Sequence, residues 1–287
     1  MKDIVIIYHG NCPDGFGGAW TAYQKFGEEA EYIGVSWQTP PPDLTDKEVY
    51  IIDFSYNAEE TEQILAETKS LTALDHHITT KAVTESVPDH LYGVDRSGAT
   101  LAWDYFFPEE NTPVFLKYLE DLDLWKFDLP RSKDFSYFIS TVPFNFKEWT
   151  NLIEDFEDDK KREEYLDKGA EIRKEKEEMM ERMISESPEA NIEGYKTRAV
   201  HIPDEMATEA RTIVSQLGNA IVNRGYEVGV IWSYTNDGRV KVSLRSEKDG
   251  QVDVAKIAEK FGGGGHHSAA SFKLRIDEKL PWEERSS

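Results

Sequence analysis

The sequence predicts an α/β protein with two domains, and three observations support this class. Short β-rich runs alternate with helical runs through the first third of the chain, as in a parallel sheet with helices on both faces. A densely charged stretch follows, and a second alternation begins after Pro188. A length of 287 residues also suits two domains of ordinary size.

These shifts in composition predict the domain limits. We expect a parallel-sheet N-terminal domain over residues 1–150, a charged helical connector over 151–190, a smaller α/β domain over 191–280 and a loose tail over 281–287. The apolar residues of the connector are sparse but helically spaced, which predicts one long helix or two.

The N-terminal elements follow from local pattern. Apolar, β-rich runs predict strands at residues 4–8, 31–37, 49–53, 71–75 and 90–94. Helical runs cover residues 16–26 and 58–69, and a further helix begins after Ser97, whose hydroxyl suits an N-cap.

The C-terminal elements are read in the same way. Strands are predicted at residues 197–202, 226–232, 240–245 and 270–276, with helices at 206–223 and 252–261. Asn236, Asp237 and Gly238 predict a hairpin turn. Residues 262–265 are four successive glycines. They predict a loop whose successive N–H groups can form an anion-binding nest.

The charge limits the substrates. The formal net charge is −22, from 55 acidic and 33 basic residues. Such a surface repels long polyanions, because Lys and Arg contacts supply most non-specific affinity for nucleic acid. We therefore expect no binding of long duplex nucleic acid, while a short nucleotide or phosphate substrate remains compatible with a few local cations. A homodimer is left open.

The cellular context follows from composition. The single cysteine, Cys12, allows neither an intramolecular disulfide nor a multi-cysteine zinc site. No apolar run approaches the length that spans a bilayer, and the N-terminus lacks the layout of a signal peptide. We expect a cytoplasmic protein without a membrane partner.

Acidic and imidazole side chains follow three predicted strands of the first domain. They are His9, Asp14, Asp53, Asp75, His76 and His77. The carboxyl ends of parallel strands lie along one edge of a sheet, where ligands bind. Singly, Asp14 also suits a turn and Asp53 a helix cap, and the two histidines could be a satisfied polar pair. Their convergence favours a site for a divalent ion such as manganese or magnesium.

The motifs around these residues resemble the DHH phosphoesterase family. The family includes nano-RNases, cyclic-dinucleotide phosphodiesterases, the RecJ exonuclease, exopolyphosphatases and family II pyrophosphatases. The resemblance rests on IVIIYHGNCPDGFGGAW from Ile4, IIDFS from Ile51, LDHHIT from Leu74 and EDLDLWKF from Glu120. VSLRS from Val242 and VDVAKIAEKFGGGGHHSAASF from Val252 resemble the DHH-associated, substrate-binding domain.

The resemblance implies roles for particular residues. His9, Asp14, Asp53 and His76 would ligate metal, with Asp53 bridging two ions of Mn²⁺, or of Mg²⁺ or Co²⁺. Asp121 or Asp123 would complete the set, and the alignment slightly favours Asp121. Asp75 would orient the site and His77 would face the substrate phosphate. In the second domain, the substrate-binding residues would be Arg245, Gly263, Gly264, Gly265 and His266, with Arg245 also stabilising charge during catalysis.

The implied activity is metal-dependent hydrolysis of short oligonucleotides or (cyclic) dinucleotides to mononucleotides, in a cleft between the domains. Two departures from the family pattern bear on it. Phe16 stands where many members have a second aspartate, and one extra residue separates His9 from Asp14. Ser271 also replaces a usual glycine. The alternatives are a phosphoanhydride hydrolase acting on polyphosphate or pyrophosphate, and a catalytically impaired nucleotide-binding regulator.

Overall fold

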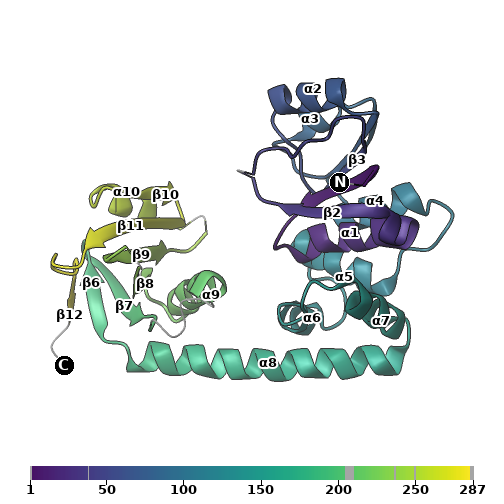
Figure 1. The fold of residues 1–287 in the computed structure, drawn as a ribbon. Coiled ribbons are helices and arrows are strands. Elements are labelled where there is room, and N and C mark those ends of the chain that lie inside the picture. The colour runs from purple at the N-terminus through teal and green to yellow at the C-terminus, as the bar shows by residue number, and fades with distance from the viewer. Residues whose placement is uncertain (1, 38, 204–209, 236, 249, 285–287) are drawn as a thin grey trace. The chain divides into compact units, whose positions relative to one another are not determined.

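The computed structural model describes residues 2–37, 39–203, 210–235, 237–248 and 250–284 (Figure 1). The chain forms two compact units, Met1–Arg173 and Lys174–Ser287. Within the described residues, no helix is long and apolar enough to cross a membrane.

The first unit is built on a sheet in which every neighbouring pair of strands is parallel, as predicted. Its spatial order is β2 (Ala30–Val35), β1 (Ile4–His9), β3 (Glu48–Ile52), β4 (Ser70–Asp75) and β5 (Asp89–Tyr92). Strands leave β1 in both directions, with β2 on one side and β3 on the other. This reversal places a ligand-binding crevice at the carboxyl ends of β1 and β3.

Helices cover both faces of this sheet (Figure 1). The helices on the sheet are α1 (Pro13–Phe26), α2 (Ala58–Glu67), α3 (Lys81–Thr84) and α4 (Gly98–Phe106), with the 3-10 turn η1 (Gly27–Glu29). A further layer consists of α5 (Val114–Asp123), which packs on α1 and α4, and of α6 (Ser132–Ile139) and α7 (Phe146–Phe156), which pack on α5. Val5 and Ile7 pack with α2, whereas Ile6 packs with α1 and α4. Successive side chains of a strand point to opposite faces, so both faces of β1 are apolar. Ser97 caps α4, as predicted.

The charged connector contains one long helix, α8 (Asp159–Glu186). Leu166 belongs to the core of the first unit, and Met180 and Ile184 belong to that of the second. Gly169 lies so close to α6 that a Cβ there would be 2.1 Å from the carbonyl oxygen of Asp134.

The second unit is a mixed sheet with two helices in its described part. The spatial order of its strands is β10 (Gly264–His266), β11 (Ala269–Arg275), β9 (Arg239–Arg245), β8 (Val228–Tyr234), β7 (Tyr195–His201), β6 (Glu189–Ile192) and β12 (Trp282–Glu284). The helices are α9 (Ala210–Asn223) and α10 (Val254–Glu259). A glycine pair brings α9 against β8, because a Cβ on Gly229 would lie 2.4 Å from the oxygen of Gly218.

Two predictions for this unit need correction. The predicted glycine loop is partly a strand, because Gly264 and Gly265 pair with β11. The predicted loose tail is wrong for residues 282–284, which form β12 and pair with β6. Trp282 drives this pairing, since its side chain is buried in the core of the unit. The predicted helical residues 206–209 and the turn residue Asn236 lie outside the described residues.

Candidate metal centre

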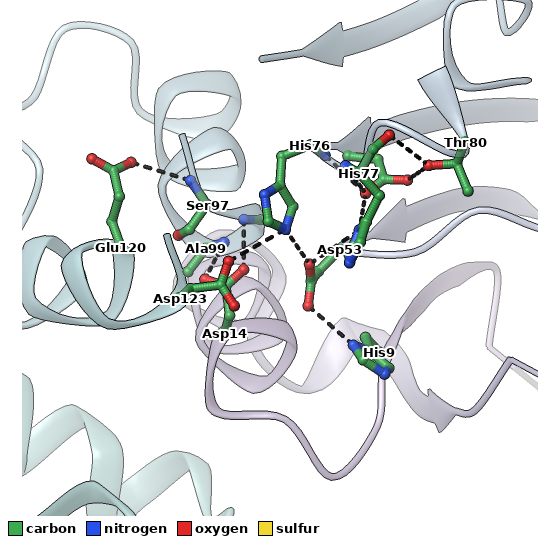
Figure 2. Close-up of polar contacts among 12 residues, drawn as sticks. His9, Asp14, Asp53, His76, His77, Thr80, Ser97, Ala99, Glu120 and Asp123 are labelled. Atoms are coloured by element: carbon green, nitrogen blue, oxygen red, sulfur yellow. Dashed lines mark hydrogen bonds and ion pairs between the residues drawn. The ribbon is translucent and has the colours of Figure 1, made fainter. Parts of the chain in front are cut away.

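The acidic and imidazole residues of the first unit meet at the carboxyl edge of its sheet. His9 ends β1, Asp53 follows β3, and His76 follows Asp75, the last residue of β4. Figure 2 shows His9, His76 and Asp53 pointing toward one another. The convergence predicted from the strand order is therefore present in the structure.

Asp53 lies at the middle of this cluster. Its Oδ2 is 3.4 Å from Nδ1 of His9, and its Oδ1 is 3.1 Å from Nε2 of His76. Nε2 of His76 also lies 3.5 Å from Oδ2 of Asp123. Potential ligand atoms lie within 4.8 Å of one another in three groups: His9–Cys12–Asp53, Asp14–His76–Asp123 and Asp53–Asp75–His76–His77. The third group contains both Asp53 and His76, and it therefore joins the other two.

The backbone at Asp53 is unusual. Its φ is 58°, a left-handed value that costs free energy for a residue with a Cβ and persists where surrounding structure imposes it. Gly98 contributes to this constraint, because a Cβ there would lie 2.4 Å from the Cβ of Asp53. Asp53 is 1% exposed, and its Oδ2 makes no hydrogen bond to any described residue. A buried carboxylate oxygen that approaches Nδ1 of His9 to 3.4 Å without a hydrogen bond suits coordination of a cation.

Asp14 lies at the start of α1 and accepts hydrogen bonds from the start of α4. The amide of Gly98 donates to its Oδ2 at 2.6 Å, and that of Ala99 donates to its Oδ1 at 3.1 Å. Burial and the charges of Asp53 and Asp123 raise its pKa well above the usual value. Burial and the charge of Asp53 also raise the pKa of Asp123. A bound cation would relieve this repulsion among three carboxylates.

Asp75 is fully buried and holds His77. Its Oδ1 accepts from Nδ1 of His77 at 2.8 Å, and its Oδ2 accepts from Thr80 at 2.6 Å and Ser55 at 3.0 Å. Burial opposes ionisation of Asp75, but the hydrogen bonds from His77 and Thr80 outweigh it and lower its pKa. The same hydrogen bond raises the pKa of His77. This geometry agrees with an orienting role for Asp75.

The structure distinguishes Asp123 from Asp121, and the slight preference for Asp121 is corrected. Asp123 lies at the cluster. The carboxylate of Asp121 instead accepts from the amides of Asp128 and Leu129 and from the hydroxyl of Ser132, so it closes the turn after α5. Asp121 and Asp123 are two positions apart, a spacing that corresponds to a rotation of about 200° around a helix axis. The two side chains therefore face opposite sides of α5.

The structure also shows the surroundings of the two departures from the family pattern. These are Phe16 and the segment between His9 and Asp14, which has one extra residue and contains Cys12. Phe16 is buried and stacks on Phe144 and Phe146 at 5.0 Å, so this position faces the aromatic core. Cys12 lies beside His9 and Asp53, a placement that sequence reasoning missed because it considered only disulfides and zinc. Burial, followed by the charge of Asp53, raises the pKa of its thiol to about 12. Without a bound cation, Cys12 is therefore a neutral thiol at neutral pH.

Of the residues predicted to bind substrate in the second unit, some line a cavity and others do not. A cavity of about 640 Å³ is lined by Arg245, Gly264 and Gly265, together with the aromatic residues Trp232 and Tyr234. Arg245 donates to Ser215 at 2.8 Å, and burial lowers its pKa.

Two further residues of the predicted set lie differently. His266 is exposed on β10. Gly263 packs under β11, where a Cβ would be 2.2 Å from the oxygen of Ser271.

The fold and the site together define a class: an α/β protein with a carboxylate–imidazole centre at the edge of a parallel sheet, followed by a mixed-sheet unit with its own cavity. Comparison with known proteins places the chain more narrowly. Residues 200–281 match the DHHA1 domain family.

Two solved structures share the fold. The pGpG-specific phosphodiesterase PggH of Vibrio cholerae is 11% identical, with a TM-score of 0.54 over 96% of this chain and 94% of that one. The DHH domain of a protein assigned to a family of ribosomal proteins is 15% identical, with a TM-score of 0.55 over 96% and 83%. Among sequences, uncharacterized protein R106 of Acanthamoeba polyphaga mimivirus is 27% identical over 304 residues, which cover 98% of this chain and 70% of that protein.

The chain therefore contains a stretch that matches the DHHA1 domain family, at residues 200–281, and shares its fold with PggH and with a DHH domain. The resemblance and the α/β class predicted from the sequence are thereby confirmed. The cluster around Asp53 supplies residues that could bind divalent metal ions.

Proposed function

We propose that this protein hydrolyses phosphodiester bonds in short oligonucleotides or (cyclic) dinucleotides, using divalent ions bound by His9, Asp14, Asp53, His76 and Asp123. The observation that carries the proposal is the central position of Asp53. It shares one group of potential ligands with His9 and another with His76, so it could serve two ions. Carboxylate oxygens and imidazole nitrogens suit Mn²⁺, Mg²⁺ or Co²⁺.

The metal supplies the part of the chemistry that the side chains lack. Divalent ions held by these residues would polarise a phosphoryl oxygen and would lower the pKa of a bound water molecule toward neutrality. His77 has a separate task. Asp75 holds its Nδ1 as a donor, which leaves Nε2 for a substrate oxygen. Its raised pKa favours the imidazolium, which stabilises negative charge on the phosphate.

The second unit is proposed to recognise the rest of the substrate. Its cavity offers Arg245 and Lys241 for a phosphate and Trp232 and Tyr234 for the face of a base. PggH, which shares the fold, is described as pGpG-specific, which supports a dinucleotide as substrate. The net charge of −22 favours short substrates over long polyanions.

The test is product analysis with manganese present. Purified protein is incubated with pGpG, pApA and pyrophosphate, and nucleoside monophosphate and orthophosphate are measured. We expect monophosphate from the dinucleotides and no turnover after Asp53→Ala. Glu85→Gln is the control, because Glu85 is an exposed partner of Lys81. Turnover of pyrophosphate alone would contradict the proposal in favour of a phosphoanhydride hydrolase, and nucleotide binding without turnover would favour a regulator.

A further inference from the structure

A second cavity lies in the first unit, beside the metal centre. Its volume is about 470 Å³, within the range of sites for small molecules. It is lined by residues that follow β3, by the start of α2, and by Thr79 and Thr80, which follow the paired histidines. None of the roles assigned above uses it.

Aromatic rings form one side of this cavity. The ring of Phe54 lies 5.2 Å from that of Trp37 and 4.8 Å from that of Tyr56. Phe54 and Tyr56 are buried, but Trp37 is 50% exposed. Its ring also lies 5.7 Å from the ring of His9 and 5.4 Å from that of His77. Trp37 therefore contacts both the cavity and the residues of the metal centre.

The rest of the lining mixes the apolar residues Pro40, Ala58 and Val83 with polar side chains, and Glu60 is the charged residue among those described there. Ser55 and Thr80 donate their hydroxyl protons to Asp75, so they remain available as acceptors, while Asn57 and Thr79 add an amide and a hydroxyl. The described residues lining the cavity include no lysine or arginine. The start of α2 is also satisfied internally: Asn57 accepts from the amide of Glu60, and the carboxylate of Glu60 accepts from the amide of Asn57. A phosphate would meet the Glu60 carboxylate there, so the lining favours a planar, uncharged group with hydrogen-bonding edges.

The cavity is connected to the reacting centre by hydrogen bonds. Ser55 and Thr80 line it, and both donate to Asp75, which holds His77. A group bound there would thus lie next to the residue proposed to contact the phosphate.

We propose that this cavity binds the nucleobase adjacent to the cleaved phosphodiester, with Trp37 stacking on the base. The reaction that it serves rests on the proposed function, but the binding of a base does not. Every nucleobase presents a π-face to an aromatic ring, and its edges carry the donors and acceptors that Ser, Thr and Asn side chains match. Trp37 is then a substrate-binding residue that favours substrates with a base at this position over those without one.

The experiment is a double-mutant cycle between protein and substrate. Steady-state rates are measured with pApA and with two analogues that each lack one base, for wild type, Trp37→Ala and Trp37→Phe. We expect Trp37→Ala to lower kcat/KM for pApA by about 5- to 150-fold, the range for stacking of one base, mainly through KM. Trp37→Ala should change kcat/KM little for the analogue that lacks the stacked base. Trp37→Phe should keep most of the wild-type kcat/KM for pApA, because phenylalanine also stacks on a base.

Trp125→Ala is the matched control. Trp125 is a tryptophan of the same unit, is 79% exposed, and is not part of the lining. It should affect all three substrates by the same factor. Manganese affinity is measured for each variant, because Trp37 contacts His9 and His77, and it should be unchanged. The proposal is overturned if Trp37→Ala lowers kcat/KM equally for pApA and both analogues, whereas hydrolysis of pApA by the wild type would still support the proposed function.

A binding measurement separates the two proposals completely. If the wild type hydrolyses no dinucleotide, the proposed function fails, and the base site is then judged by calorimetric titration with free adenosine and guanosine. Binding to the wild type that is lost in Trp37→Ala supports the site. Absence of binding to the wild type overturns it.

Discussion

Gly98 offers a test of the metal centre that removes no ligand. A Cβ added there would lie 2.4 Å from the Cβ and 2.9 Å from the Cα of Asp53, whereas ordinary contacts begin at 3.4 Å. Asp53 or the start of α4 must therefore move by about 1 Å. The amide of Gly98 also donates to Asp14, so two proposed ligands shift together.

The expected loss follows from this displacement. A misplacement of about 1 Å can cost about 100-fold in rate, so Gly98→Ala should lose about that factor in kcat and should bind manganese more weakly. Alanine is otherwise the better helix former, so a loss would come from the contact with Asp53. The assays are calorimetric titration with Mn²⁺ and steady-state hydrolysis of pGpG.

Gly93→Ala is the matched control. A Cβ there would meet its nearest atom at 3.6 Å, an ordinary contact, so this variant should behave as wild type. If Gly98→Ala binds manganese with wild-type affinity, the central position assigned to Asp53 is wrong. If binding weakens but turnover of pGpG is unchanged, Asp53 binds metal without serving the reaction.

Three further predictions concern the protonation of His76, the different roles of Asp121 and Asp123, and the packing of α8 on α6. Burial lowers the pKa of His76, but the hydrogen bond with Asp53 and the neighbouring carboxylates outweigh it and raise the pKa to about 9. Protonated His76 therefore stabilises the metal-free fold fully below the pKa that His76 has in the unfolded chain, and this stability is lost as pH rises towards 9. Manganese affinity should increase over the same range, because the ion displaces the proton. Denaturant unfolding and calorimetry at several pH values check this, and a His76→Gln variant that kept the same pH dependence would contradict it. Asp123→Asn should weaken manganese binding with little change in the free energy of unfolding. Asp121→Asn should keep manganese binding but lower the free energy of unfolding by about 1–3 kcal/mol, because Asp121 accepts three hydrogen bonds in the turn after α5. The opposite pattern in calorimetry and urea unfolding would reverse the two assignments. Gly169→Ala should lower the unfolding temperature, since its Cβ would lie 2.1 Å from the oxygen of Asp134; an unchanged or higher midpoint in a thermal melt would show that α8 can move away from α6.

Much of the N-terminal unit was predictable from local pattern. The apolar runs at β1, β3 and β4 are short and end in polar residues, so both the strands and their carboxyl ends could be located. Parallel pairing then required His9, Asp53 and His76 to lie at one edge. This argument needed no distances, because the geometry of a parallel sheet supplies them.

The C-terminal unit shows where local pattern fails. Residues 282–284 look like a charged tail around one tryptophan, and they become a strand only because β6 offers an open edge and the core of the unit buries Trp282. Gly264 and Gly265 look like a loop for the same reason: their pairing with β11 is decided by a partner strand, not by their own propensity.

The sequence by itself determined the order of elements, the acidic charge and the set of residues from which a metal centre could be built. Each of these depends on short-range periodicity or on counting. The tertiary structure decided which members of the set meet: Asp123 and not Asp121, with Phe16 in the core and Trp37 between a cavity and the histidines. Those choices depend on the rotation of a helix and on the packing of distant segments, which arise only when the chain is folded.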